Sequence, residues 1–211
     1  MEKIIELIGV KKVFKGNELF SDVNLQIEKG TIVGFKGRNG VGKSVLFKMI
    51  SGLYMPDEGS IYVRGKKIGE DIDYPSNMGI MIDTPSFIEV LSGYENLLML
   101  AEINGIISGD RIKEEMVKFG LDANSKKSVK NYSLGMRAKL GIIQATMEGQ
   151  DIIVLDEPFN ALDEKSCEYV YALIKTLKAK GATILLTSHN QSDLDELCDI
   201  QYLLPTFTAS N

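Results

Sequence analysis

The segment Gly37-Arg38-Asn39-Gly40-Val41-Gly42-Lys43-Ser44 decides the fold of this chain. It matches the pattern G-x-x-x-x-G-K-[ST] at every constrained position. Glycines let the backbone curl so that successive N–H groups converge on phosphate oxygens, and the following helix points its positive dipole end at the same place. Lys43 adds a cation for the outer phosphates, and the Ser44 hydroxyl suits the accompanying magnesium ion. The segment therefore predicts a site for a nucleoside triphosphate.

The residues on either side of this loop have the pattern that such a loop requires. The apolar run 31–35 predicts a short strand before it, and Val45 opens a predicted helix that ends near Ile50. Leu46, Met49 and Ile50 fall on one face of that helix. A glycine-rich turn of no function would not explain a strand on one side and an amphipathic helix on the other.

Apolar periodicity over the rest of the chain predicts an α/β protein of the P-loop NTPase type. Its core sheet is mixed but mainly parallel, an antiparallel β subdomain lies near the N-terminus, and a helical subdomain is inserted at residues 84–150. Residues 1–83 and 151–211 form the rest of this single domain. The predicted elements are antiparallel hairpins over 3–27 and 60–68, strands at 78–82, 151–156 and 182–187, and helices at 94–103, 110–119, 134–147 and 163–180. Residues 205–211 give no structural signal.

Composition excludes several classes of protein. With 211 residues, 44% hydrophobic and 25% charged, the chain has the make-up of a soluble globular protein, and its net charge of −5 argues against binding nucleic acid. Its two cysteines, Cys167 and Cys198, are too few for a disulfide framework and fit reduced thiols in the cytosol. No apolar run reaches the 18 or so residues that span a bilayer, and the N-terminus lacks a signal-peptide pattern. Any membrane role therefore needs a partner.

Two adjacent carboxylates follow the apolar strand at 151–156. Asp156 ends that strand, where its carboxylate can reach a magnesium ion held against the β- and γ-phosphates. Glu157 comes next and is suited to polarising an attacking water, which favours hydrolysis over transfer to another hydroxyl group. The pair could instead be the acidic start of a helix, since acids favour that end.

The single histidine, His189, follows the strand at 182–187. Ligand-binding residues of open α/β sheets gather at the carboxyl ends of strands, so this side chain could bond the γ-phosphate and hold the attacking water in line. A lone histidine is more often a surface or capping residue. Its position among the other motifs favours the functional interpretation, and we expect Lys43, Glu157 and His189 to form the catalytic set.

Ser133-Leu134-Gly135-Met136 opens the predicted helix 134–147, with Ser133 as its cap. A hydroxyl, a glycine and a helix N-terminus also make a second anion site, far along the chain from Lys43. One γ-phosphate does not need two cradles from one subunit.

The order of these motifs over nearly the whole chain resembles the ATP-binding cassette of ABC transporters. The matching motifs are the phosphate loop, Ser133-Leu134-Gly135-Met136, Leu155-Asp156-Glu157-Pro158, Ala161-Leu162-Asp163 and His189. The resemblance implies a head-to-tail pair of cassettes with two shared ATP sites, in which Ser133, Leu134 and Gly135 contact the partner's γ-phosphate. Asp163 would lie in the loop that links the two sites, and Phe14 would stack on adenine, while Gly37–Val45 would hold the phosphates.

The same resemblance implies ATP and Mg²⁺ as ligands and transmembrane permease subunits as partners. The protein would then lie at the cytoplasmic face of the cell membrane, held there through those subunits. Most cassettes have glutamine where this chain has Asp83, for which we expect a role beside the metal together with Ser44 and Asp156. The segment Ser133–Met136, called the signature below, lacks the second glycine and the glutamine that are usual in the family. Val45 replaces a hydroxyl residue. These departures look like cassettes of bacitracin and lantibiotic export or immunity systems.

Two alternatives stay open. The chain could be a cassette ATPase that serves a soluble assembly or regulatory complex, or a small-molecule kinase, although Glu157 and the signature argue against the kinase. The chain stops soon after Leu204, earlier than most relatives, so the final small strands of the fold are expected to be missing.

Overall fold

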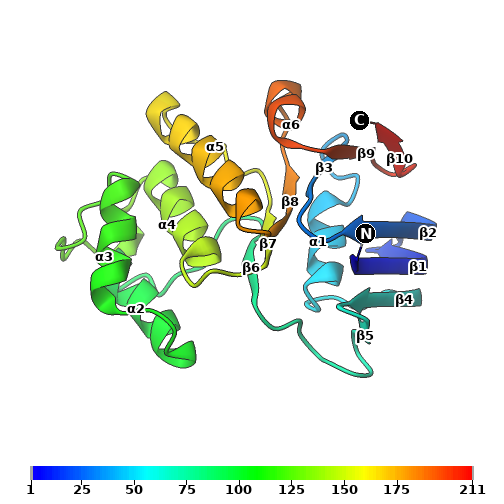
Figure 1. Ribbon diagram of the computed structural model, residues 1–211, viewed down its shortest axis with the longest axis horizontal. Coiled ribbons are helices and arrows are strands. Elements are labelled where there is room, and N and C mark those ends of the chain that lie inside the picture. Colours follow the sequence, from blue (N-terminus) through cyan, green and yellow to red (C-terminus); the bar gives the residue numbers. More distant parts are fainter. Residues whose placement is uncertain (1, 211) are drawn as a thin grey trace.

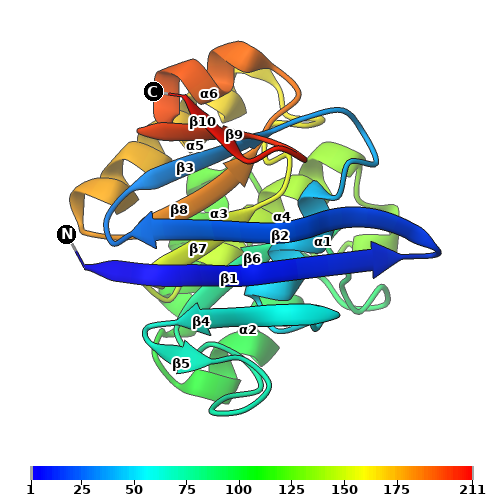
Figure 2. The same ribbon diagram turned by 90° about the vertical axis from the view of Figure 1, so that its right-hand side faces the viewer.

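The chain begins with a long antiparallel pair, β1 (Lys3–Phe14) and β2 (Asn17–Glu28), which confirms the first predicted hairpin. The shorter strands β4 (Glu58–Val63) and β5 (Lys66–Lys67) extend it to a four-stranded sheet of order β2-β1-β4-β5. Figure 2 shows this antiparallel sheet as the face nearest the viewer. The structure is a computed structural model that describes residues 2–210.

A second sheet of six strands has the order β10-β9-β3-β8-β7-β6. Its strands are β3 (Ile32–Lys36), β6 (Met78–Met81), β7 (Ile152–Leu155), β8 (Thr183–Thr187), β9 (Ile200–Leu203) and β10 (Thr208–Ser210). All neighbouring pairs are parallel except β9 and β10. The predicted mixed, mainly parallel core sheet is therefore confirmed. Strands β7 and β8 are buried along their whole length, as parallel strands covered on both faces should be.

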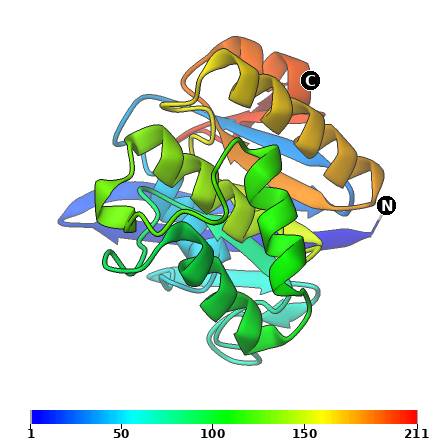
Figure 3. The ribbon, with the colours of Figure 1, turned by 90° about the vertical axis from the view of Figure 1, so that its left-hand side faces the viewer.

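Helices cover the two faces of the second sheet. They are α1 (Lys43–Ile50), α2 (Gly93–Asn104), α3 (Gly109–Lys118), α4 (Leu134–Thr146), α5 (Glu164–Ala179) and α6 (Gln191–Leu197), with a 3-10 turn at Val129–Asn131. Figure 3 shows α2 to α5 on the face away from the antiparallel sheet. No helix within residues 2–210 is long and apolar enough to cross a membrane.

Two hydrophobic cores lie on opposite faces of the parallel sheet. Helix α1 lies between the two sheets (Figure 1), where Leu46 and Phe47 are fully buried with Phe20 of β2. On the other face, α4 packs against β6 so closely that a Cβ at Gly79 would lie 1.8 Å from the Ala145 carbonyl oxygen. The helices α2, α3 and α4 all lie between residues 84 and 150, and the division of the chain there stays a prediction.

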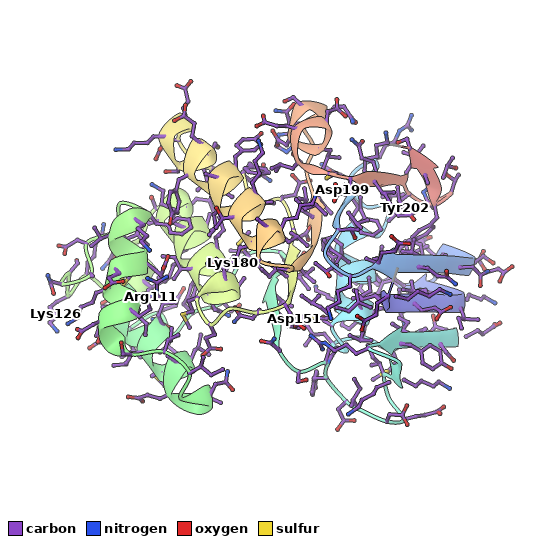
Figure 4. All side chains as sticks on the ribbon, in the orientation of Figure 1. Arg111, Lys126, Asp151, Lys180, Asp199 and Tyr202 are labelled. Atoms are coloured by element: carbon purple, nitrogen blue, oxygen red, sulfur yellow. The ribbon has the colours of Figure 1, made fainter. Side chains whose placement is uncertain are left out.

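The last part of the chain corrects one expectation. Residues 205–211 carry no structural signal in the sequence and the final small strands were expected to be missing, yet β9 and β10 form one edge of the sheet. The Asp199 carboxylate accepts a hydrogen bond from the Ile32 N–H at 2.8 Å, and the Tyr202 ring stacks on Phe35 at 5.8 Å (Figure 4). These contacts to β3 hold β9 in the parallel sheet.

Candidate functional site

The predicted site residues follow the carboxyl ends of three neighbouring strands of the parallel sheet, β3, β7 and β8. The register pairs Phe35 of β3 with Thr187 of β8, and Leu155 of β7 with Leu186 of β8. The phosphate loop follows β3, Asp156 follows β7, and His189 follows β8 by two residues. A cleft of about 700 Å³ opens at this edge, and its lining includes Phe14, Lys43, Ser44, Asp83, Asp156 and Glu157.

The phosphate loop turns into α1 at Gly42, which has φ 107°. A Cβ there would lie 2.6 Å from the Phe20 ring, so both the backbone angle and the space require glycine. Lys43 is 8% exposed and its Nζ donates to the Gly37 carbonyl oxygen at 2.8 Å, which folds the ammonium group over the loop. The first N–H groups of α1 have no partner within the helix and meet the cleft. This cradle fits a chain of phosphates.

The metal-binding side of the cleft joins the loop to β7. Ser44 Oγ donates to Asp156 Oδ2 at 2.5 Å, and Thr187 Oγ1 donates to Asp156 Oδ1 at 2.6 Å. The carboxylate of Asp156, a residue only 7% exposed, is therefore held by two hydroxyl groups. Magnesium in such sites keeps several waters and takes one or two protein oxygens besides the phosphates. Ser44 and Asp156 fit that requirement.

Glu157 and His189 are in direct contact. Glu157 Oε2 accepts from the His189 N–H at 3.0 Å and lies 3.0 Å from His189 Nδ1. With its proton on Nδ1 the ring donates to Oε2, and Nε2 remains as an acceptor. The Glu157 backbone has φ 52°, an angle that is uncommon outside glycine, and its N–H donates to Thr187 Oγ1 at 2.9 Å. Glu157 thus has a fixed place beside the Asp156 carboxylate.

Asp83 is placed near the metal-binding residues, but its carboxylate is engaged elsewhere. Its N–H lies 3.5 Å from Asp156 Oδ2, while its side chain forms an ion pair with Lys48 of α1. That carboxylate, with burial opposing, raises the pKa of Lys48 above its ordinary value. The predicted role of Asp83 at the metal therefore needs either a movement of this side chain or an indirect contact.

Phe14 lies at the end of β1 and lines the cleft, as its predicted role on adenine requires. Its ring stacks on Tyr54 with centroids 5.9 Å apart and an interplanar angle of 25°. Lys15 Nζ lies 5.7 Å from the centroid of the Phe14 ring, and Lys48 Nζ lies 5.3 Å from that of Tyr54. The Phe14 ring, predicted to stack on a base, is therefore supported by Tyr54.

The signature opens α4, where Ser133 Oγ accepts from the Met136 N–H at 3.2 Å and caps the helix as predicted. Leu134 is 62% exposed and lines the cleft together with Arg137. A Cβ at Gly135 would lie 2.5 Å from the Ala161 carbonyl oxygen, so the helix start is pressed against the loop that carries Ala161.

Asp163 ends that loop and caps α5. It accepts from the N–H and the hydroxyl of Ser166 at 2.9 and 2.8 Å, and forms an ion pair with Lys139 of α4 at 3.1 Å. The bonds from Ser166 and the Lys139 charge lower the pKa of Asp163 to about 2. The signature helix and the Asp163 loop are therefore joined through Gly135 and through Lys139.

Comparison with known proteins gives the family. The profile of the ABC transporter family matches residues 20–160. This chain belongs to the ABC transporter family, as an ATP-binding subunit. The cassette is 38% identical to the ABC transporter ATP-binding protein YybJ of Bacillus subtilis, over 93% of this chain and 90% of that protein. It is 34% identical to the bacitracin transport ATP-binding protein BcrA of Enterococcus faecalis, over 95% of this chain and 66% of that protein.

Solved structures agree with this membership. An ATP-binding subunit of an ABC transporter superposes on the cassette with a TM-score of 0.88 at 26% identity, over 99% of this chain and 90% of that chain. A dimeric cassette in a post-hydrolysis state bound to ADP and Pi superposes with a TM-score of 0.83 at 24% identity, over 95% of this chain and 94% of that chain. The cassette is thus an ATP-binding ABC-type ATPase with the fold that its sequence predicted.

Sequence reasoning missed three residues of the cassette's site. Thr187 could have been found, because it is a buried hydroxyl residue at the end of an apolar strand and two positions before His189. Tyr54 and Lys48 gave no usable signal, since an aromatic residue after a helix and a lysine within one are common. Only the fold brings Tyr54 against Phe14 and Lys48 against Asp83.

Proposed function

We propose that two such cassettes close head to tail over ATP, and that hydrolysis reopens them to drive export through separate membrane subunits. The observation that carries this proposal is the position of the Glu157–His189 contact beside the Ser44–Asp156 contact, at the end of neighbouring strands. The Ser44–Asp156 pair suits the metal and the phosphates, and the Glu157–His189 pair suits an attacking water. Together they favour hydrolysis over phosphoryl transfer to a hydroxyl substrate.

Each residue has a role that its contacts support. Lys43 and the N–H groups at the start of α1 bind the β- and γ-phosphates. Magnesium, when bound through Ser44 and Asp156, supplies positive charge against those phosphates. The Glu157 carboxylate takes a proton from water as the water oxygen attacks the γ-phosphorus and the bond to the bridging oxygen breaks. His189 holds Glu157 through its backbone N–H and, with a proton on each ring nitrogen, donates from Nδ1 to Glu157 and from Nε2 to the γ-phosphate.

The signature supports a site shared between two chains. Its helix N-terminus, with the Ser133 cap and the exposed Leu134, is a second anion site at the rim of a cleft that already has its own phosphate loop. In a head-to-tail pair, Ser133, Leu134 and Gly135 cover the γ-phosphate that the partner's loop holds. Asp163 then joins this lid to α5 and to the other site.

An apolar surface on the helical part supports a membrane partner. Asn96 of α2 exchanges hydrogen bonds with the backbone of Ile88, at 2.8 and 3.1 Å. Met99 and Ile103 follow on the same face of α2 and are 47% and 76% exposed, while Ile88 itself is 47% exposed. An exposed apolar surface of this kind suits contact with another protein. We assign it to a permease subunit.

The names of relatives support export as the direction. The cassette is similar to a bacitracin transport protein and to the lantibiotic transport ATP-binding protein SrtF of Streptococcus pyogenes, at 31% identity over 93% of this chain and 84% of that protein. The signature and Asp83 of this chain also resemble those of bacitracin and lantibiotic export systems, and we assign export on that ground. An ATPase that serves a soluble assembly complex is the alternative, and it predicts partners that purify without detergent.

Size-exclusion chromatography of Glu157→Gln tests the paired mechanism. This variant keeps the size of the side chain and one acceptor oxygen but cannot take the proton of water, so ATP and magnesium should hold it as a dimer. The matched control, Glu157→Gln with Lys43→Ala, lacks the phosphate contact and should stay monomeric. A Glu157→Gln protein that stays monomeric with ATP at all concentrations contradicts the proposal.

Affinity purification from native membranes tests the partner. In mild detergent, the tagged cassette should retain a polytopic membrane protein, and Ile103→Glu should lose it while still binding ATP. Glu102→Gln, a change at the neighbouring position of α2, is the control and should retain the membrane protein. Recovery of the cassette in a soluble complex with no membrane protein would instead support the alternative.

A further inference from the structure

The residues on both sides of His189 are tied to one buried carboxylate. Asp193 is 5% exposed and lies in the first turn of α6. Its Oδ2 accepts from Ser188 Oγ at 2.5 Å, and its Oδ1 accepts from Asn190 Nδ2 at 3.1 Å. The Asn190 N–H also donates to Ser188 Oγ at 3.0 Å, so the two neighbours of His189 are joined to each other as well. The side chain of His189 itself is 66% exposed, and its neighbours therefore determine where it stands.

The same carboxylate is anchored to α5. Tyr171 OH donates to Asp193 Oδ1 at 2.6 Å. Burial, together with this bond to Asp193, raises the pKa of Tyr171, so the phenol stays a donor at any working pH. The Tyr171 ring stacks on Phe159 with centroids 4.9 Å apart and an interplanar angle of 20°. Phe159 lies two residues after Glu157, and one tyrosine thus touches both the His189 segment and the loop that follows Glu157.

We propose that Asp193 is a positioning residue for hydrolysis, which holds the His189 segment at the distance from Glu157 that the reaction needs. This inference rests on the proposed role of the Glu157–His189 pair. The buried Asp193 carboxylate accepts from three side-chain donors, and these bonds fix the segment. The charge is needed because a neutral side chain of the same size, such as asparagine, cannot accept from all three donors. Tyr171 then couples this anchor to α5 and to Phe159.

The main test is Asp193→Asn, a change that keeps the size of the side chain and removes one acceptor. Misplacement of a reacting group by about 1 Å can lower a rate by about a hundredfold, so we expect kcat to fall by about tenfold or more. The Kd for ADP should change by less than about twofold, because the phosphate loop is not involved. The matched control is Tyr171→Phe, which loses a bond to the same carboxylate but keeps both bonds to the neighbours of His189. It should retain about half of kcat or more.

Coupling to His189 separates positioning from general support of the fold. If Asp193 acts through His189, Asp193→Asn should lower kcat little further in a protein that already carries His189→Ala. An equal loss of kcat in Asp193→Asn and Tyr171→Phe, or a full additional loss in the His189→Ala background, overturns the proposal. Ser188→Ala tests the same link without changing the buried charge, and it gives the decisive measurement if Asp193→Asn does not fold. We expect it to lower kcat and to show the same coupling, and an additive effect overturns the proposal.

The outcome also distinguishes this inference from the proposed function. If His189→Ala hydrolyses ATP at the wild-type rate, the proposed role of His189 is wrong, whatever Asp193→Asn does. If His189→Ala has a kcat at least tenfold below the wild type while Asp193→Asn hydrolyses ATP at the wild-type rate, only the positioning role fails.

Discussion

Thr187 donates a hydrogen bond of 2.6 Å from its hydroxyl to Asp156 Oδ1, at the carboxyl ends of two neighbouring parallel strands. The same hydroxyl accepts from the Glu157 N–H at 2.9 Å. Glu157 has a backbone φ of 52°, which costs energy in a residue other than glycine. One buried hydroxyl thus fixes the carboxylate that suits the metal and the turn that orients the residue next to it.

Replacement of Thr187 by valine should therefore impair both neighbours. The change keeps the shape of the side chain but removes the hydroxyl partner of Asp156 Oδ1 and of the Glu157 N–H, while Ser44 still donates to Asp156 Oδ2. Hydrogen bonds to charged groups contribute about 1.5 to 3 kcal/mol, and the free energy of unfolding should fall by about that amount. ATPase activity should fall by about tenfold or more. Urea denaturation and phosphate release measure the two effects, and Thr187→Ser, which keeps the hydroxyl, should lose much less of either.

Removal of the Phe14 ring should weaken nucleotide binding. Stacking of a base on an aromatic side chain contributes about 1 to 3 kcal/mol, so Phe14→Ala should raise the Kd for ADP by about five- to 150-fold. Tyr54→Phe keeps the ring that supports Phe14 and serves as the control, with a Kd near that of the wild type. Isothermal titration calorimetry gives both values. An unchanged Kd in Phe14→Ala would show that the adenine of the nucleotide does not stack on Phe14.

The ion pair between Lys48 and Asp83 should matter because it neutralises a carboxylate next to the Asp156 site. In Lys48→Met the carboxylate loses its cation and repels the phosphates, so the KM for Mg·ATP should rise. Asp83→Asn added to Lys48→Met removes the unpaired charge and should lower the KM again. Steady-state kinetics at several magnesium concentrations tests this. A double variant that is worse than Lys48→Met alone would show that the carboxylate itself serves the metal.

The stability of the cassette should depend on Asp163 at low pH. Its pKa lies at about 2 in the folded chain, below the ordinary value of 3.8, since Ser166 and Lys139 favour the charged form. A depressed pKa contributes stability that is fully present above pH 3.8 and is lost as the pH falls towards 2. Asp163→Asn should therefore show a smaller loss of stability between about pH 4 and pH 2 than the wild type. Chemical denaturation across this range measures the difference, and parallel curves for the two proteins would contradict it.

Most of the fold could be predicted because its strong patterns are local. The buried strands β7 and β8 are continuous apolar runs, and the start of α4 was predicted at Leu134, where the structure begins it. The missed elements have weak patterns. Helix α6 is short and mostly polar, and β10 has three exposed residues that are held mainly by the pairing with β9.

The site residues likewise divide into those that a local motif reveals and those that only long-range contacts reveal. The phosphate loop, Asp156 and Glu157 carry their chemistry within short segments, so their spacing reveals them. Thr187 lies 31 residues from Asp156, and Lys48 reaches Asp83 only because α1 lies beside the segment after β6. Such contacts depend on strand register and helix packing, which no local pattern specifies.

A mixing experiment tests whether one chain completes the site of another. Gly135→Ala puts a Cβ about 2.5 Å from the Ala161 carbonyl oxygen and should displace the signature, yet leave ADP binding to the monomer unchanged. Lys43→Ala should lose the phosphate contact and keep the signature intact. Each variant alone lacks one half of both sites in a head-to-tail dimer and should be inactive.

In the mixed dimer, the loop of the Gly135→Ala chain meets the intact signature of the Lys43→Ala chain, which restores one of the two sites. ATP hydrolysis by the mixture should therefore exceed the sum of the separate activities. The control is a mixture of Gly135→Ala with a chain that carries both changes, where no site is complete. If the first mixture hydrolyses no more ATP than this control, two copies of this chain do not share their sites.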